Sequence, residues 1–167
     1  HIFGMPSNIS DIIKVSNEWG IPVVEDAAEA LGSSANNVHC GLYGKCGVLS
    51  FNGNKIITTG GGGVVITNNK KLYEKVKHLS STAKVFHKYE FIHDQVGFNY
   101  RMNNLNSSFG VGQIIKIRKF INNKRNLFKK YNENFRKIEG CKIFKEPKGA
   151  KSNYWLQTLF IKNLKSL

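Results

Sequence analysis

The stretch "SFNGNKIITTGGGG", residues 50–63, decides how this chain folds. A single lysine, Lys55, follows the apolar run 47–51, and four consecutive glycines come soon after it. Each glycine costs about 0.5–1 kcal/mol relative to Ala in regular structure, so a flexible surface turn is one interpretation. However, a second β-branched run resumes at once at residues 64–67, which favours a tight return between two buried strands. Such a return lets the backbone come close to a ligand.

The segments on either side have the alternation that is typical of α/β proteins. The patterns predict helices over residues 8–20 and 69–81 and buried strands over residues 21–26, 47–51 and 64–67. In open α/β sheets a ligand lies outside the carboxyl ends of the strands. Asp26 ends one predicted strand and Ser50–Lys55 follows another, so we expect these residues at one edge of the sheet.

The second half of the chain has a different organisation. Residues 83–102 show little periodicity, which indicates a long loop that is functional or lies at an interface. Residues 103–138 have a helical pattern, either one long helix or two, and Gly140 ends it. Residues 141–144 and 154–161 are predicted to be strands of a smaller α+β unit.

Charge is distributed unevenly along the 167 residues. The net charge is +14, and it lies in the second half of the chain. A basic half is typical of nucleic-acid binding but also of an ordinary solvated surface. The lysines are spread through predicted helices and no nucleic-acid motif is present, so we favour the solvated surface and expect no nucleic-acid partner.

The cysteines and the apolar runs exclude several other classes of protein. Three cysteines without a CxxC spacing support neither a disulfide framework nor a metal site, and they fit a reducing cytoplasm. No apolar run approaches the roughly 20 residues that a membrane-spanning helix needs, so we expect no membrane partner.

Three side chains near the predicted sheet edge match what a pyridoxal phosphate site requires. That site needs a lysine for the Schiff base, a carboxylate for the pyridine nitrogen and hydroxyl groups for the phosphate. Lys55, Asp26 and Ser50 supply these groups. From spacing alone, an aspartate at a strand end is also a common helix cap, and a single lysine is often only solvated.

Three motifs that occur in a fixed order along the chain favour the cofactor site over the helix cap and the solvated lysine. The segments "PVVEDAAEALGS" (22–33), "GVLSFNGNKIITTGGGGVVIT" (47–67) and "GFNYRMNN" (97–104) resemble the DegT/DnrJ/EryC1/StrS family of pyridoxal phosphate-dependent sugar aminotransferases. The resemblance extends over nearly the whole chain, from "HIFGMP" to "NYWLQT". It implies an α/β chain with part of the pyridoxal phosphate-dependent transferase fold type I. That fold is a mostly parallel sheet with helices, followed by the start of a small α+β carboxyl-terminal domain.

The resemblance also assigns roles to individual residues. Lys55 would be the catalytic residue, joined to the cofactor as a Schiff base and moving the proton to the substrate carbon. Asp26 would pair with the pyridine nitrogen, and Glu29 would lie near the phenolic oxygen of the ring. Ser50 would hold the phosphate, and Asn99 would reach the phosphate of a neighbouring subunit. Asn52 departs from the family, because many relatives carry His there.

The implied reaction moves an amino group from glutamate to C4 of a nucleotide-linked 4-keto-6-deoxy sugar. The sequences of the motifs are most similar to those of the branch that acts on UDP-4-keto-6-deoxy-N-acetylhexosamines. The resemblance also implies a homodimer that works in the cytoplasm. The resemblance divides the chain into the carboxyl-terminal part of the large cofactor-binding domain at 1–103, a linking long helix or helices at 104–139 and the start of the small carboxyl-terminal domain at 140–167. It also implies further segments before and after the chain, so the alternatives are an inactive fragment or, from another class, a basic nucleic-acid-binding protein.

Overall fold

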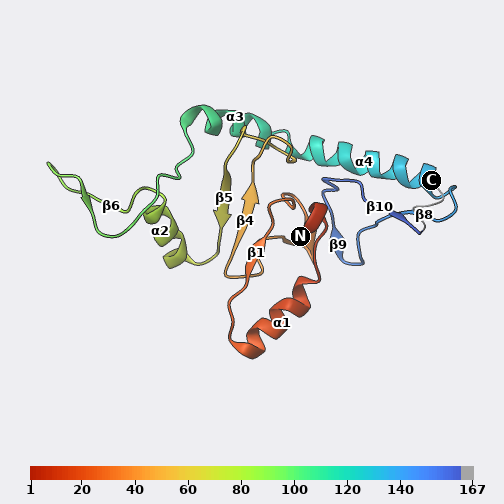
Figure 1. Ribbon diagram of the computed structural model, residues 1–167, viewed down its shortest axis with the longest axis horizontal. Coiled ribbons are helices and arrows are strands. Elements are labelled where there is room, and N and C mark those ends of the chain that lie inside the picture. Colours follow the sequence, from red (N-terminus) through yellow and green to blue (C-terminus); the bar gives the residue numbers. More distant parts are fainter. Residues whose placement is uncertain (163–167) are drawn as a thin grey trace.

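The computed structural model describes residues 1–162 and consists of a small central sheet with helices at both ends (Figure 1). The helices are η1 (Ile2–Gly4), α1 (Ile9–Trp19), α2 (Lys70–Leu79), α3 (Asn104–Ile114) and α4 (Ile117–Phe135). The strands are β1 (Val24–Asp26), β2 (Ser34–Ala35), β3 (Val38–His39), β4 (Cys46–Ser50), β5 (Gly63–Ile66), β6 (Lys84–Val85), β7 (Ile92–His93), β8 (Cys141–Ile143), β9 (Ala150–Lys151) and β10 (Leu159–Ile161).

The central sheet has the strand order β1-β4-β5. Strands β1 and β4 are parallel, with Asp26 opposite Val48, whereas β4 and β5 are antiparallel, with Ser50 opposite Gly63. The glycine-rich segment causes the antiparallel pairing, because it returns the chain directly beside β4. The Phe51 N–H donates to Gly62 O at 2.9 Å, which closes this return. The predicted tight return between two strands is therefore confirmed, and among the described residues the parallel pairing is limited to one strand pair. The predicted burial is wrong for two strands: β1 begins only at Val24, which is 63% exposed, and Val65 of β5 is 40% exposed.

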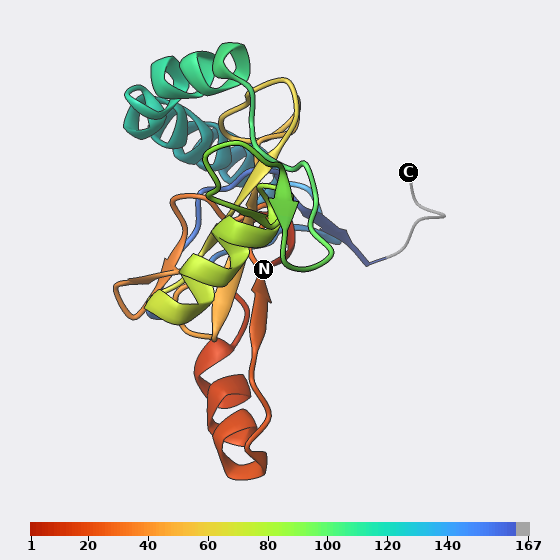
Figure 2. The same cartoon turned by 90° about the vertical axis from the view of Figure 1, so that its left-hand side faces the viewer.

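The predicted helix boundaries agree with the structure. Gly20 ends α1 in the left-handed conformation, with φ of 63°, and the Asn69 side chain caps α2 by accepting from Leu72 N–H. The helical stretch from residue 103 forms two helices, α3 and α4. Figure 2 shows α1 extending from one end of the sheet, while α3 and α4 lie at the other end.

Some strands differ from the prediction. The predicted loop 83–102 contains the short hairpin β6–β7, and the three-stranded sheet β3-β2-β9 joins residues 34–39 to residues 150–151. The predicted strand 154–161 is extended only in β10, which pairs with β8. The preceding residues 154–158 are not a strand, because Tyr154 has a φ of 50° and the indole N–H of Trp155 bonds to another segment, as described below. The last five residues of the predicted domain 140–167 lie outside the described part.

The core consists of two adjoining clusters. The first lies beneath the sheet and contains Ala27, Ala30, Cys40 and Leu49, and burial raises the pKa of the Cys40 thiol to about 11. The second contains Ile56, Ile57 and Trp155, so it joins the segment after Lys55 to the segment around residue 155. Among the described residues, no helix is long and apolar enough to cross a membrane.

Candidate active site

The structure places Asp26 and Ser50 at the same edge and on the same face of the sheet. Strand register sets Asp26 beside Val48, and side chains two residues apart share a face, so Ser50 lies on the face of Asp26. The alternation of burial agrees: Glu25 is buried on the opposite face, whereas Asp26 is exposed. A carboxylate and a hydroxyl therefore project from the face that the packed core does not cover.

Lys55 lies in the loop that follows this edge. Its Nζ is 3.6 Å from Glu29 Oε1, and its side chain is only 14% exposed. The same nitrogen lies 4.2 Å from the ring centroid of Trp155. The backbone N–H of Lys55 donates to Asn52 O at 3.1 Å, which fixes the start of the loop. The amine is thus held between a carboxylate and an indole ring rather than extended into solvent.

Glu29 and Asp26 line one cavity of about 270 Å³, together with His1, Ile2 and Ala28. The Phe3 N–H donates to Glu29 Oε2 at 2.6 Å, which leaves the other carboxylate oxygen directed to Lys55. Asp26 Oδ1 accepts from Ala28 N–H at 3.1 Å, so this carboxylate also caps the turn that follows β1. The structure therefore brings together Lys55 and Glu29, and Asp26 shares the adjoining cavity.

Two predicted site residues are not in contact with this group. Ser50 Oγ accepts from Asn52 N–H at 3.3 Å, and Asn99 is exposed and pairs with Ser81 in an isolated antiparallel bridge. Among residues 1–162, no hydrogen bond or ion pair joins either side chain to Lys55. The segment 83–100, which contains β6 and which we call the arm, projects away from the central sheet (Figure 1). Asn99 belongs to this segment and is tied to Ser81 by the bridge.

Sequence analysis missed the buried carboxylate of Glu25. It is 3% exposed and accepts from the N–H groups of Gly41, Tyr43 and Gly44 at 2.6–2.7 Å. His1 Nε2 lies 3.0 Å from the same carboxylate, and Ser7 N–H donates to His1 Nδ1 at 3.1 Å, so Nε2 carries the proton. The sequence carried a signal for this role. Of two consecutive carboxylates in one strand, alternation requires that one point into the core.

Residues 152–155, which we call the clamp, were also missed. The Asn153 amide nitrogen donates to Glu29 O at 2.8 Å and to Leu31 O at 2.9 Å. Trp155 Nε1–H donates to Asn54 O at 2.6 Å, and Ser152 Oγ donates to Gly4 O at 2.9 Å. The clamp therefore fixes the turn that bears Glu29 and the loop that bears Lys55. No local pattern in the sequence indicates bonds between residues that lie more than 100 positions apart.

An ion pair connects α4 to the clamp. Arg125 donates to both oxygens of Glu146, at 2.9 and 2.8 Å, and to Ser152 O at 2.6 Å. Burial raises the pKa of the Glu146 carboxyl, but hydrogen bonds from Arg125 and from the Ser152 N–H outweigh it, so this pKa lies below its usual value. This bidentate pair holds α4 against the part of the site that Trp155 forms.

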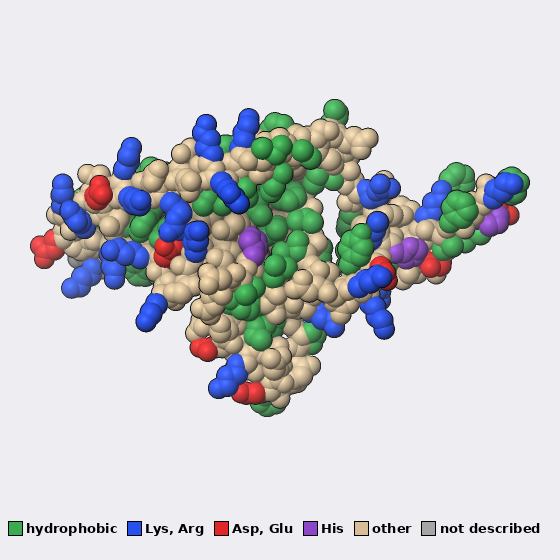
Figure 3. Space-filling model, turned by 180° about the vertical axis from the view of Figure 1, so that it is seen from behind, with side chains coloured by type: hydrophobic (Ala, Val, Ile, Leu, Met, Phe, Trp, Pro, Cys, Tyr) green, Lys and Arg blue, Asp and Glu red, His purple; other side chains and the backbone are tan. Residues whose placement is uncertain are grey.

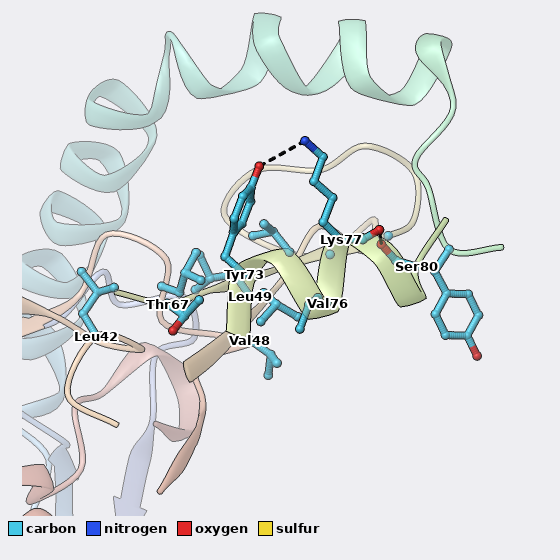
Figure 4. Close-up of a pocket in the computed structure, with 14 residues that line it drawn as sticks. Leu42, Val48, Leu49, Thr67, Tyr73, Val76, Lys77 and Ser80 are labelled. Atoms are coloured by element: carbon cyan, nitrogen blue, oxygen red, sulfur yellow. Dashed lines mark hydrogen bonds between the residues drawn. The ribbon is translucent and has the colours of Figure 1, made fainter. Parts of the chain in front are cut away.

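A larger cavity, of about 880 Å³, lies between β5 and α2 (Figure 4). Its wall is mainly apolar and includes Val48, Val76 and Tyr73, whose hydroxyl accepts from Lys77 Nζ at 3.3 Å. Neither Lys55, Asp26 nor Glu29 lines it. Figure 3 shows that lysine and arginine side chains are spread along α4 and the arm rather than gathered at one cavity.

The sequence matches the DegT/DnrJ/EryC1/StrS aminotransferase family over residues 1–166. The chain belongs to this family. The resemblance that the three motifs predict is therefore confirmed.

Individual relatives agree with this assignment. EpsN of Bacillus subtilis strain 168, named as a pyridoxal phosphate-dependent aminotransferase, is 33% identical over 165 residues, which cover 98% of this chain and 42% of EpsN. GDP-perosamine synthase of Escherichia coli O157:H7 is 33% identical over 159 residues, which cover 95% of this chain and 43% of that enzyme. The chain thus spans less than half the length of these relatives.

Solved structures confirm the predicted fold. The aminotransferase TlmJ from Streptoalloteichus hindustanus superposes with a TM-score of 0.91 at 28% identity, covering 96% of this chain and 44% of TlmJ. Helicobacter pylori PseC, an aminotransferase in pseudoaminic acid biosynthesis, gives a TM-score of 0.90 at 25% identity, covering 98% and 44%. The chain is therefore an α/β part of the fold type I aminotransferases. The division at residues 103 and 139 stays a prediction.

Proposed function

We propose that this chain forms part of a pyridoxal phosphate-dependent aminotransferase that moves an amino group from glutamate to C4 of a nucleotide-linked 4-keto-6-deoxy sugar. The contact that supports this best is that of Lys55 with Glu29, beside the cavity that Asp26 lines. An amine and two carboxylates at the carboxyl edge of a parallel strand pair are the groups that the cofactor requires. They are also the residues that the family's motifs select.

The residues present fit the cofactor. Lys55 would bind it and afterwards carry a proton to and from the reacting carbon of the substrate. Asp26 would pair with the ring nitrogen, and Glu29 would lie near the phenolic oxygen. Ser50, on the same sheet face as Asp26, would donate its hydroxyl to the phosphate. When bound, the cofactor supplies an electron-withdrawing ring that stabilises negative charge at the substrate carbon.

The surroundings of Lys55 would exclude water from the reacting amine. Ile56, Ile57 and Trp155 form a buried apolar cluster directly after and beside it. In such a shielded place, a carboxylate acts more strongly on a neighbouring charge than it does in water. The clamp would keep this cluster in position while substrate enters from the exposed sheet face.

The substrate assignment rests on the amino-acid sequences of the motifs and on the names of the relatives. Those names include GDP-perosamine synthase and, at 27% identity, a UDP-4-amino-4,6-dideoxy-N-acetyl-beta-L-altrosamine transaminase of Campylobacter jejuni. We propose a UDP-linked N-acetylhexosamine as the keto-sugar. The compartment we propose is the cytoplasm, where nucleotide sugars and glutamate would both be available to it.

The arm supports the proposal of a homodimer. It exposes aromatic side chains, among them Phe86 at 95% and Phe91 at 80% exposure, and such apolar surface is typical of a region that another subunit or another segment covers. In a dimer, the arm of one subunit would lie against its neighbour, and Asn99 would extend to the neighbour's cofactor phosphate. Longer relatives contain more than twice the polypeptide, so the working unit would include further segments beside this chain.

Cofactor binding tests the proposal directly. The chain is mixed with pyridoxal phosphate, and the visible absorbance of the lysine-bound cofactor is recorded. Borohydride reduction followed by peptide mass mapping then identifies the labelled lysine. We expect the label on Lys55, its loss in Lys55→Ala, and its retention in Lys70→Ala, where the side chain is 88% exposed.

Two outcomes would contradict the proposal in different ways. If the wild-type chain gives no absorbance and no label, the alternative of an inactive fragment is supported. If the label is distributed over exposed lysines such as Lys70, the site has no selective amine and the assignment of Lys55 is wrong. With binding established, conversion of glutamate to 2-oxoglutarate tests the donor.

A further inference from the structure

The free amine of Lys55 occupies a defined position. Its Nζ lies 4.2 Å from the ring centroid of Trp155 and 3.6 Å from Glu29 Oε1. A lysine ammonium is attracted to the negative face of an indole ring, and indole is the best of the aromatic side chains for this contact. The carboxylate adds a second attraction to the same charge. The lysine side chain is 14% exposed and that of Glu29 is 27% exposed, so both contacts are largely shielded from water.

Trp155 is held so that its ring cannot turn away from the lysine. It is 6% exposed, its indole N–H donates to Asn54 O at 2.6 Å, and its backbone N–H donates to Asn153 Oδ1 at 2.8 Å. The acceptor of the hydrogen bond from the indole is the backbone of Asn54, the residue directly before Lys55. Ring and lysine therefore belong to one fixed unit, although about 100 residues separate them along the chain.

We propose that Trp155 and Glu29 form a seat that holds the Lys55 ammonium whenever its amine is free. The role of that ammonium rests on the proposed function, in which Lys55 carries a proton to and from the substrate carbon. A protonated lysine without a seat would turn towards water and leave the reacting carbon. Once Nζ gives up its proton, the charge that both contacts attract is gone, and the neutral amine is released. Trp155 is thus a positioning residue for Lys55.

Acetylation of lysines in the cofactor-free chain tests the seat. An N-hydroxysuccinimidyl acetate reagent reaches Nζ only when the side chain leaves its contacts, so holding Lys55 between the ring and the carboxylate slows its modification. We expect Trp155→Leu to raise the acetylation rate of Lys55 about twofold to thirtyfold, the range of a cation–π contact. Trp155→Phe keeps an aromatic face and should retain most of the protection. Lys70 in the same molecule is the internal reference, and its rate should not change.

Fluorescence gives a second readout that does not depend on the folding of Trp155 variants. The chain has two tryptophans, so Trp19→Phe, at an exposed position, leaves Trp155 as the only emitter. In that background, Lys55→Met removes the charge above the ring, and we expect the emission of Trp155 to change. Lys70→Met removes a distant surface charge and should leave the emission unchanged.

Three results would overturn the seat. The first is an unchanged Lys55 acetylation rate in Trp155→Leu. The second is a Trp155→Phe variant as reactive as Trp155→Leu, which would assign the effect to the Asn54 bond rather than to the ring face. The third is identical Trp155 emission with and without the Lys55 charge. Neither readout uses cofactor, so a protected Lys55 in a chain that binds no pyridoxal phosphate would contradict the proposed function alone.

Discussion

The site and the arm are built in opposite ways. Around the site, polar side chains are buried and hydrogen-bonded, as Glu25 and Asn153 are, and the backbone between them has little freedom. The arm instead leaves large apolar side chains such as Phe86 and Val96 in solvent. The difference indicates two tasks. A reactive amine needs surroundings that hold it in one place, whereas exposed apolar surface is typical of a region that another surface covers.

The largest effect should come from removing the buried carboxylate. Glu25→Ala leaves three backbone N–H groups and His1 without an acceptor, and each unsatisfied buried donor costs about 1–3 kcal/mol. We expect the free energy of unfolding to fall by about 4 kcal/mol after partial rearrangement, measured by urea denaturation. Glu18→Ala is the matched control, because Glu18 is exposed on α1 and should change stability by less than about 0.5 kcal/mol.

Equal urea midpoints for the two glutamate variants would show that the buried carboxylate does not hold the end of β1. The site would then depend on Asp26 and its turn alone. A loss confined to Glu25→Ala would instead support the view that the site is anchored from the face of β1 opposite to Asp26.

A second, smaller effect separates backbone strain from close packing. Gly4 and Gly20 both have positive φ, of 80° and 63°, but their surroundings differ. A Cβ at Gly4 would lie 1.8 Å from Asn153 Oδ1, whereas nothing lies within 4 Å of one at Gly20. We expect Gly20→Ala to cost about 1 kcal/mol, from left-handed strain alone, and Gly4→Ala about 3 kcal/mol. Thermal unfolding of both variants checks the difference.

Gly4→Ala should also disturb the site, since Asn153 must move and its bond to Glu29 O would weaken. Lys55 acetylation would then rise in Gly4→Ala and stay unchanged in Gly20→Ala. Identical stability losses in the two glycine variants would mean that the clamp yields easily, and the contrast between site and arm would be weaker than the structure indicates.

Much of this arrangement was predictable from the sequence where the signals are local. Periodicity and caps predict α1 and α2, and the glycine run predicts the return from β4 to β5. Asp26 and Ser50 at one sheet edge follow from strand order once β1 and β4 are parallel. The contact between Lys55 and Glu29 was not predicted, because the family resemblance only assigned each of the two residues a role beside the same cofactor ring.

The parts that sequence reasoning missed depend on contacts between distant segments. Residues 154–158 have the apolar pattern of a strand, yet Trp155 and the preceding Asn153 bond to segments more than 100 residues earlier, and those bonds replace a strand partner. The short strand β9 likewise has its partner, β2, more than 100 residues earlier in the chain. The propensity of a segment for a secondary structure depends on its own residues and does not reveal such distant partners. Tertiary contacts therefore override it.

The smallest effect on stability should come from the arm. Phe86 is 95% exposed, so Phe86→Ser removes no packing and should change the free energy of unfolding by less than about 0.5 kcal/mol. The same type of change at Ile57, which is 2% exposed beside the clamp, removes a buried side chain and should cost about 2–5 kcal/mol. Urea denaturation compares the two.

Sedimentation analysis of the same pair tests what the arm is for. If it docks on a second copy of the chain, Phe86→Ser weakens self-association while the folded chain stays as stable as before. A change in self-association without a change in stability would separate the two regions by function, since the site contributes to the fold and the arm to assembly. If Phe86→Ser instead lowers stability, the arm packs against its own chain in solution, and the proposal that Asn99 serves a neighbouring subunit loses its support.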